Sequence, residues 1–151
     1  MATAAIIGSS GYSGQETLDR VLRHPELEVI ALGSDSLAGE SASALDLRLN
    51  GSLPAFVANE DALAAGADVI FLCVSNERSA AIEPPADTIV VDLSGAHRIA
   101  DWSYAIPELY PPEGKLIANP GCYATAALLA LAPIANAIDP TSVVVDGKSG
   151  V

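Results

Sequence analysis

The N-terminal 33 residues hold an apolar run, a glycine-rich turn, an amphipathic segment and a second apolar run. We expect a buried strand at residues 4–7, a helix at residues 15–23 and a strand at residues 27–32. In the turn, glycines recur at every third position: Gly8, Gly11 and Gly14. This succession predicts a right-handed βαβ crossover, which commits the chain to a parallel sheet with helices on its faces.

The glycine turn has the physical properties of a dinucleotide site. Glycines let the backbone approach a pyrophosphate, and the N-terminus of the helix that follows points its N–H groups at the ligand. The spacing is Gly-x-x-Gly-x-x-Gly, which differs from the common fingerprint. A plain turn is the alternative interpretation, but the strand before and the helix after favour phosphate binding.

The second strand ends in a polar segment where the adenosine ribose of a dinucleotide normally lies. Asp35 follows the glycines by about 20 positions, where an acidic residue holds the ribose 2′-hydroxyl of NAD. Ser34 and Ser36 could instead donate hydrogen bonds to the 2′-phosphate of NADP, and we expect no Arg or Lys nearby to pair with that phosphate. A solvated turn is the third interpretation. The segment leaves the choice between NAD and NADP open.

Strands and helices continue to alternate along the chain. We expect strands at residues 67–74, 88–93, 115–118 and 142–146, a weaker edge strand at 53–57, a helix at 60–65 and a turn at Asn50-Gly51. The alternation predicts an α/β fold with a doubly wound, mostly parallel, Rossmann-like sheet. Ligands bind at the carboxyl ends of such strands, where Ser75 and Ser94 follow two of them.

A cysteine stands where a strand gives way to an Ala/Leu-rich helix. Pro120 ends the strand and suits the first turn of a helix, so Cys122 is expected beside the helix N-terminus. Unpaired N–H groups and the helix dipole there favour the thiolate, the nucleophilic form. The alternative is a buried cysteine that packs as a small hydrophobe. We assign that structural role to Cys73, which lies inside an apolar strand.

Composition excludes several classes of function. Seven basic and nineteen acidic residues give a net charge of −12, so we expect neither a nucleic-acid partner nor an anionic membrane surface. We see no signal peptide and no apolar run long enough to span a bilayer. These features, with two cysteines expected to be free thiols, predict a cytoplasmic location. The chain stops after an apolar strand, so we expect it to be the N-terminal part of a longer protein.

Three polar residues in loops are weaker candidates. Arg98 could pair with a substrate phosphate or carboxylate, or with an acidic residue of the protein. Glu108 could lie at the edge of a site, although a solvated side chain is the simpler interpretation. We interpret His97 as a surface residue.

Taken together, these stretches resemble N-acetyl-γ-glutamyl-phosphate reductase of arginine biosynthesis, a relative of aspartate-semialdehyde dehydrogenase. The resemblance covers essentially the whole chain. Its most specific part is the heptapeptide Asn119-Pro120-Gly121-Cys122-Tyr123-Ala124-Thr125. The heptapeptide Gly8-Ser9-Ser10-Gly11-Tyr12-Ser13-Gly14 supports it, together with residues 91–94, 106–109 and 147–150.

The resemblance implies that residues 1–151 form an NAD(P)-binding domain, with the catalytic segment at 119–125 and a link to a second domain at 142–151. Cys122 would attack the acyl phosphate, and the Asn119 side chain or the N–H groups of the helix would steady the oxyanion. NADP, or NAD, would supply the hydride, with no metal. The implied pyrophosphate contacts are Gly8, Ser10, Gly11, Tyr12, Ser13 and Gly14. The family also implies a homo-oligomer and a small-molecule acyl phosphate as substrate.

The sequence departs from the family pattern at two turns, at residues 75–78 and at Ala96-His97. The catalytic histidine of the family comes from the second domain, which this chain largely lacks. Three alternatives stay open: a reductase of an aminoadipate phosphate in lysine biosynthesis, a closer relative of aspartate-semialdehyde dehydrogenase, and an inactive dinucleotide-binding module. We expect the isolated chain to lack turnover.

Overall fold

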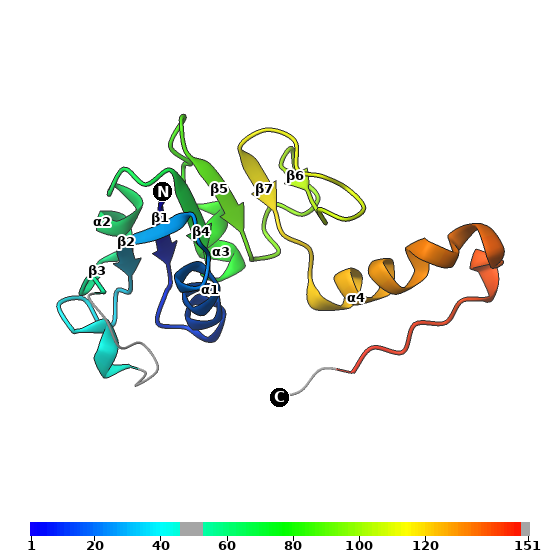
Figure 1. Cartoon of the computed structure of the whole chain (residues 1–151), viewed down its shortest axis with the longest axis horizontal. Coiled ribbons are helices and arrows are strands. Elements are labelled where there is room, and N and C mark those ends of the chain that lie inside the picture. Colours follow the sequence, from blue (N-terminus) through cyan, green and yellow to red (C-terminus); the bar gives the residue numbers. More distant parts are fainter. Residues whose placement is uncertain (46–52, 149–151) are drawn as a thin grey trace.

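The computed structural model describes residues 1–45 and 53–148. These residues form a seven-stranded sheet in the order β3-β2-β1-β4-β5-β7-β6 (Figure 1), and every pairing is parallel. The predicted doubly wound α/β fold is therefore confirmed. The strands are β1 (Ala2–Ile7), β2 (Leu27–Gly33), β3 (Phe56–Val57), β4 (Val69–Leu72), β5 (Ile89–Asp92), β6 (Ser103–Tyr104) and β7 (Leu116–Ala118).

Four α-helices and three 3₁₀ segments accompany the sheet in the described ranges. The α-helices are α1 (Tyr12–Leu22), α2 (Asn59–Leu63), α3 (Asn76–Ala80) and α4 (Cys122–Leu131). The 3₁₀ segments are Ala42–Ala44, Ala132–Ala137 and Pro140–Ser142. Helix α1 begins three residues earlier than the sequence pattern predicts, because Gly11 serves as its N-cap directly after the glycine turn.

Strand β1 is buried on both faces, which explains its uninterrupted apolar run. Ala4 and Ile6 belong to a core cluster that includes Leu18 of α1. Ala5 and Ile7 point the other way into a cluster that includes residues of α2 and β4. Side chains alternate between the faces of a strand, so the helices on each face of the sheet pack against alternate side chains of β1.

The strand order reverses at β1, which pairs with β2 on one side and β4 on the other. In a parallel sheet the carboxyl ends of all strands meet at one edge, and this reversal opens a crevice there. The glycine turn after β1 and the segment after β4 both lie at this edge.

The expected strand at residues 142–146 is wrong. The structure has the 3₁₀ segment Pro140–Ser142 followed by residues without regular structure. Val144 and Val145 are 90% and 59% exposed, and no neighbouring strand pairs with them among the described residues. An apolar run forms a strand only where a partner accepts its backbone hydrogen bonds. The predicted turn at Asn50-Gly51 and residues 149–151 of the expected link lie outside the described residues.

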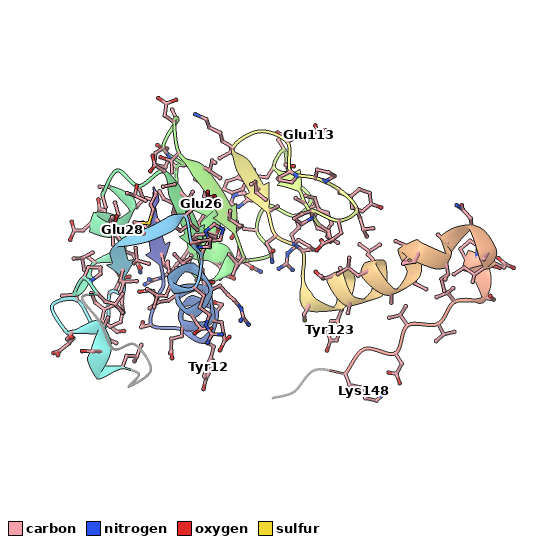
Figure 2. The ribbon with its side chains drawn as sticks, in the orientation of Figure 1. Tyr12, Glu26, Glu28, Glu113, Tyr123 and Lys148 are labelled. Carbon is pink, nitrogen blue, oxygen red and sulfur yellow. The ribbon has the colours of Figure 1, made fainter. Side chains whose placement is uncertain are left out.

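Helix α4 projects away from the sheet (Figure 1), and none of its residues is buried. The chain then turns back, and Gly147 lies against the ring of Tyr123 near the start of the helix. Figure 2 labels Tyr123 and Lys148, the residue after Gly147. Among the helices that the structure describes, none combines the length and the apolar composition needed to cross a lipid bilayer.

We predict that Gly14→Ala destabilises the fold by about 1–3 kcal/mol through overpacking. A Cβ atom at Gly14 would lie 2.3 Å from the carbonyl oxygen of Gly8 and 2.6 Å from Cα of Ser9. These are backbone atoms, so relief requires α1 to move away from β1. Urea unfolding monitored by circular dichroism measures the change.

Gly11→Ala is the matched control for this prediction. Its Cβ would have its nearest neighbour at 3.5 Å, an ordinary contact, so we expect a loss below about 1 kcal/mol, from replacement of the Gly N-cap alone. Equal stability of the two variants would contradict the proposed close packing.

Candidate functional site

A hollow of about 360 Å³ lies at the carboxyl edge of the sheet, where the strand order reverses. Its volume falls in the range of small-molecule sites. The hollow brings together predicted cofactor residues from three segments that are distant in sequence: Gly8, Ser10, Gly11, Ser34, Asp35, Ser36 and Ser75. It is also lined by Asn59, Cys73, Val74 and Arg78.

The glycine turn leaves room for a ligand backbone in this hollow. Gly8 has a φ of +78°, and its N–H donates to Oδ1 of Asn59 at 2.9 Å. Gly14 packs α1 closely against the end of β1. A Cβ at Gly11 would make one ordinary contact, with the carbonyl oxygen of Gly8, and would otherwise meet open space. Close helix packing together with an open glycine is what a dinucleotide pyrophosphate requires.

Four predicted cofactor residues do not line this hollow. Tyr12 is 94% exposed and points into solvent from the start of α1 (Figure 2). Ser13 is exposed and Gly14 is buried beneath the turn. The hydroxyl of Ser94 donates to Oδ2 of Asp92 at 2.9 Å, so it is engaged within the protein.

The ribose end of the hollow contains a basic residue that the sequence pattern missed. Nη1 of Arg78 donates to Oδ2 of Asp35 at 2.5 Å, which corrects the expectation that no Arg or Lys lies nearby. The backbone N–H of Asn59 donates to Oδ1 of the same carboxylate at 2.9 Å. The hydrogen bond from Asn59, followed by that from Arg78, lowers the pKa of Asp35 below its ordinary value.

A second hollow, of about 610 Å³, surrounds the predicted nucleophile. Cys122 is exposed and is the first residue of α4, with Gly121 as N-cap. The N–H and the hydroxyl of Thr125 both donate to the carbonyl of Gly121, at 2.9 and 3.0 Å, and close the first turn. The lining residues are Arg98, Ile99, Tyr104, Gly121, Cys122, Tyr123 and Ala124.

Arg98 connects the segment that precedes Cys122 to the sheet. Its Nε donates to the carbonyl of Asn119 at 3.0 Å, and its Nη2 donates to the carbonyl of Leu93 at 3.2 Å. Arg98 thus joins the ends of β5 and β7 through main-chain carbonyls. The Asn119 side chain donates to the carbonyl of Pro120 at 2.9 Å. Glu108 is exposed and does not line the hollow.

The loop that carries Arg98 is held by a buried carboxylate. Asp92 is fully buried, and its Oδ2 accepts from Nδ1 of His97 at 2.7 Å. The His97 ring also stacks on Trp102, with centroids 4.0 Å apart, so its interpretation as a surface residue is wrong. Burial raises the pKa of Asp92, but hydrogen bonds from His97 and Ser94 outweigh burial and leave this pKa below its ordinary value.

The two hollows share no lining residue. Both lie at the carboxyl edge, one above β1 and the other beyond β7, with β4 and β5 between them. Three strand spacings amount to about 14 Å. A ligand that reached both hollows would therefore have to extend across this edge.

The other cysteine behaves as the sequence predicts. Cys73 is buried, and its sulfur lies 3.5 Å from the hydroxyl of Thr17. Burial raises the pKa of the Cys73 thiol, which suits a structural role. Both cysteines are free thiols.

The fold and the first hollow define a dinucleotide-binding domain of the doubly wound class. A comparison with known families is more specific: the semialdehyde dehydrogenase NAD-binding domain matches residues 3–117. The chain therefore belongs to the semialdehyde dehydrogenase NAD-binding domain family.

Curated relatives narrow the comparison. The N-acetyl-gamma-glutamyl-phosphate reductases of Salinispora arenicola and Acidothermus cellulolyticus are each 37% identical to this chain, over 97% and 99% of its length. The chain spans about half of each relative, 51% in both cases. Among solved structures, aspartate semialdehyde dehydrogenase II from Vibrio cholerae has a TM-score of 0.72 and 27% identity, covering 91% of this chain and 43% of that chain.

We predict that iodoacetamide alkylates Cys122 at least about 100-fold faster than Cys73, because a buried thiol with a raised pKa is unreactive. Peptide mass spectrometry after timed quenching measures both rates in one sample. Comparable rates would mean that the Cys122 sulfur is covered in solution.

We predict that Asp92→Asn lowers the free energy of unfolding at pH 7 by about 1–3 kcal/mol, because the charged hydrogen bonds to His97 and Ser94 are lost. The folded-state pKa of Asp92 is depressed, so its contribution is present above the unfolded-state pKa, about 3.9, and disappears as the pH falls through the lower folded-state value. Urea unfolding should show that the difference in the free energy of unfolding between the wild type and the variant becomes smaller as the pH falls from 7 to 3. A difference independent of pH would contradict this account.

Proposed function

We propose that this chain provides the cofactor site and the nucleophile of an enzyme that reduces N-acetyl-γ-glutamyl phosphate to the semialdehyde and inorganic phosphate. One observation carries the proposal: an exposed thiol stands at the start of α4, at the same sheet edge as a hollow suited to a dinucleotide. The substrate is inferred from the names of the curated relatives. Because the chain spans half their length, the remaining catalytic groups are proposed to come from the other half.

In the proposed reaction, Cys122 acts first. Its sulfur attacks the acyl carbon, a C–S bond forms, and the C–O bond to phosphate breaks as inorganic phosphate leaves. Arg98 has N–H groups beyond those bound to Leu93 and Asn119, and these are proposed to hold the departing phosphate. The N–H groups of the first turn of α4 are proposed to stabilise the oxyanion. Asn119 is proposed to shape this turn, since its amide already bonds to Pro120.

The first hollow is proposed to hold the nicotinamide dinucleotide, with NADP as the expected form and NAD as an alternative. The backbone of Gly8, Ser10 and Gly11 would contact the pyrophosphate, and Ser34, Asp35 and Ser36 would contact the ribose. When bound in its reduced form, the dinucleotide supplies the hydride that releases the aldehyde from sulfur.

The second candidate function is reduction of aspartyl phosphate. The structural similarity to aspartate semialdehyde dehydrogenase II favours it. It uses the same thiol chemistry and differs in the acyl group. The greater identity to the N-acetyl-gamma-glutamyl-phosphate reductases, 37% against 27%, places it second.

A cytoplasmic, homo-oligomeric enzyme without nucleic-acid or membrane partners belongs to the same proposal. The charge of −12 and the two free thiols support the location. The oligomeric state comes only from the family resemblance.

We predict that Cys122→Ser lowers turnover of N-acetyl-γ-glutamyl phosphate at least about 1,000-fold, because the hydroxyl is a far weaker nucleophile at neutral pH. The assay uses a fusion protein that joins this chain to the half of a curated relative that the chain does not cover. It follows the absorbance of the nicotinamide cofactor. Aspartyl phosphate and an aminoadipate phosphate are run in parallel.

Ser142→Ala is the matched control, since it also changes a single side-chain atom but lines neither hollow. We expect its folded fraction to keep wild-type turnover. Unchanged turnover of the Cys122 variant would exclude the thiol mechanism. Dinucleotide binding without turnover of any of the three substrates would favour an inactive binding module.

A further inference from the structure

We propose that Asp35 and Arg78 together read the 2′ position of the adenosine ribose, so that this chain binds both NAD and NADP, with Arg78 as the residue that receives the 2′-phosphate. The inference rests on the proposed dinucleotide site and deepens it. Asp35 was a candidate from its place in the sequence, whereas Arg78 comes to the site only through the fold.

The pair stands where a ribose would lie. Asp35 and Arg78 line the hollow of the glycine turn. They also line an adjoining hollow of about 520 Å³, whose apolar walls include Leu63, Val74 and Ile82. The first hollow suits phosphates and the second suits a flat apolar base. Four residues line both hollows and form the boundary between them: Asp35, Asn59, Val74 and Arg78. This boundary is the position of the sugar in a nucleotide that occupies both hollows, and Asp35 and Arg78 are its charged members.

The two side chains differ in how firmly they are held. The backbone N–H of Asn59 anchors Oδ1 of Asp35 at 2.9 Å, so the carboxylate is fixed at the end of β2. The contact between Arg78 and Asp35 is solvent-exposed, with 60% and 46% of the two side chains accessible. Exposed ion pairs contribute little to stability. Arg78 is therefore free to exchange this partner, or to share its five N–H donors with a phosphate.

The neighbouring hydroxyls suit either form of the ribose. Ser34 is 2% exposed, and its hydroxyl lies 2.7 Å from that of Ser10 and 3.4 Å from that of Ser36. These groups can donate to a phosphate or accept from a sugar hydroxyl. A carboxylate accepts hydrogen bonds from a ribose diol but repels a phosphate. A guanidinium attracts a phosphate and donates hydrogen bonds to its oxygens.

The acidic residues around the site make the binding of NADP depend on Arg78. The adjoining hollow is also lined by Glu60 and Glu83, which oppose a phosphate, as does Asp35. Among the described residues that line the two hollows, Arg78 is the one basic side chain. Without Arg78 the charged side chains of the site would all be negative, and they would weaken the binding of NADP through its 2′-phosphate.

Calorimetric titration of the chain with NAD and with NADP tests the proposal. We expect the wild type to bind both with dissociation constants within about tenfold of each other, because the two side chains act in opposite directions. Arg78→Gln should weaken NADP binding at least about tenfold and NAD binding less than about threefold, as expected for loss of one charged phosphate contact. Asp35→Asn should shift the ratio toward NADP.

Arg20→Gln is the matched control for the change in net charge. Arg20 lies on α1, pairs with Glu16 and lines neither hollow, so this variant should leave both affinities unchanged. In the double variant of Asp35 and Arg78, we expect NADP to bind more weakly than in Asp35→Asn alone.

Each remaining outcome has one meaning. Equal loss of NAD and NADP in Arg78→Gln would overturn the inference but leave the dinucleotide site intact, as would a wild type that binds one cofactor alone. If the wild type binds neither cofactor while its circular dichroism shows a folded protein, the proposed dinucleotide site fails, and this inference fails with it.

Discussion

The close approach of α1 to the end of β1 governs the geometry of the dinucleotide hollow. Gly14 lies so near the carbonyl of Gly8 that no side chain fits between them. This contact is possible because β1 is covered on both faces and therefore fixed in the core. The first turn of α1 is thereby held beside the glycine turn, where its free N–H groups can meet a pyrophosphate.

The thiol is positioned by a different device, based on hydrogen bonds instead of close packing. The buried Asp92 holds His97, and the next residue, Arg98, reaches the carbonyls of Leu93 and Asn119. A charged donor is well suited to this task because each of its bonds is stronger than a neutral one. The end of β7 and the first residue of α4 are consequently set relative to β5, although α4 itself makes little contact with the sheet.

Local patterns in the sequence were sufficient to predict the doubly wound parallel sheet, the glycine turn and the place of Cys122 at a helix start. They failed where the outcome depends on a neighbour distant in sequence. Arg78 meets Asp35 only because β2 and β4 flank β1, and one clue existed, since Arg78 follows a strand that ends at the ligand edge. His97 was misjudged because its partner Asp92 faces inward. The valines at 143–145 read as a strand, yet the described residues offer them no pairing partner.

The exposure of α4 has a consequence for its local dynamics. A helix of 10 residues is marginal by itself in water, and tertiary contacts usually supply the missing stability. The contacts of α4 with distant segments described above, with Arg98 and Gly147, lie around its first turn, whereas its other end contacts the 3₁₀ segment Ala132–Ala137 that follows it. The helix and this segment should therefore fray from their far end, with rapid amide exchange there, while the turn that bears the sulfur stays ordered.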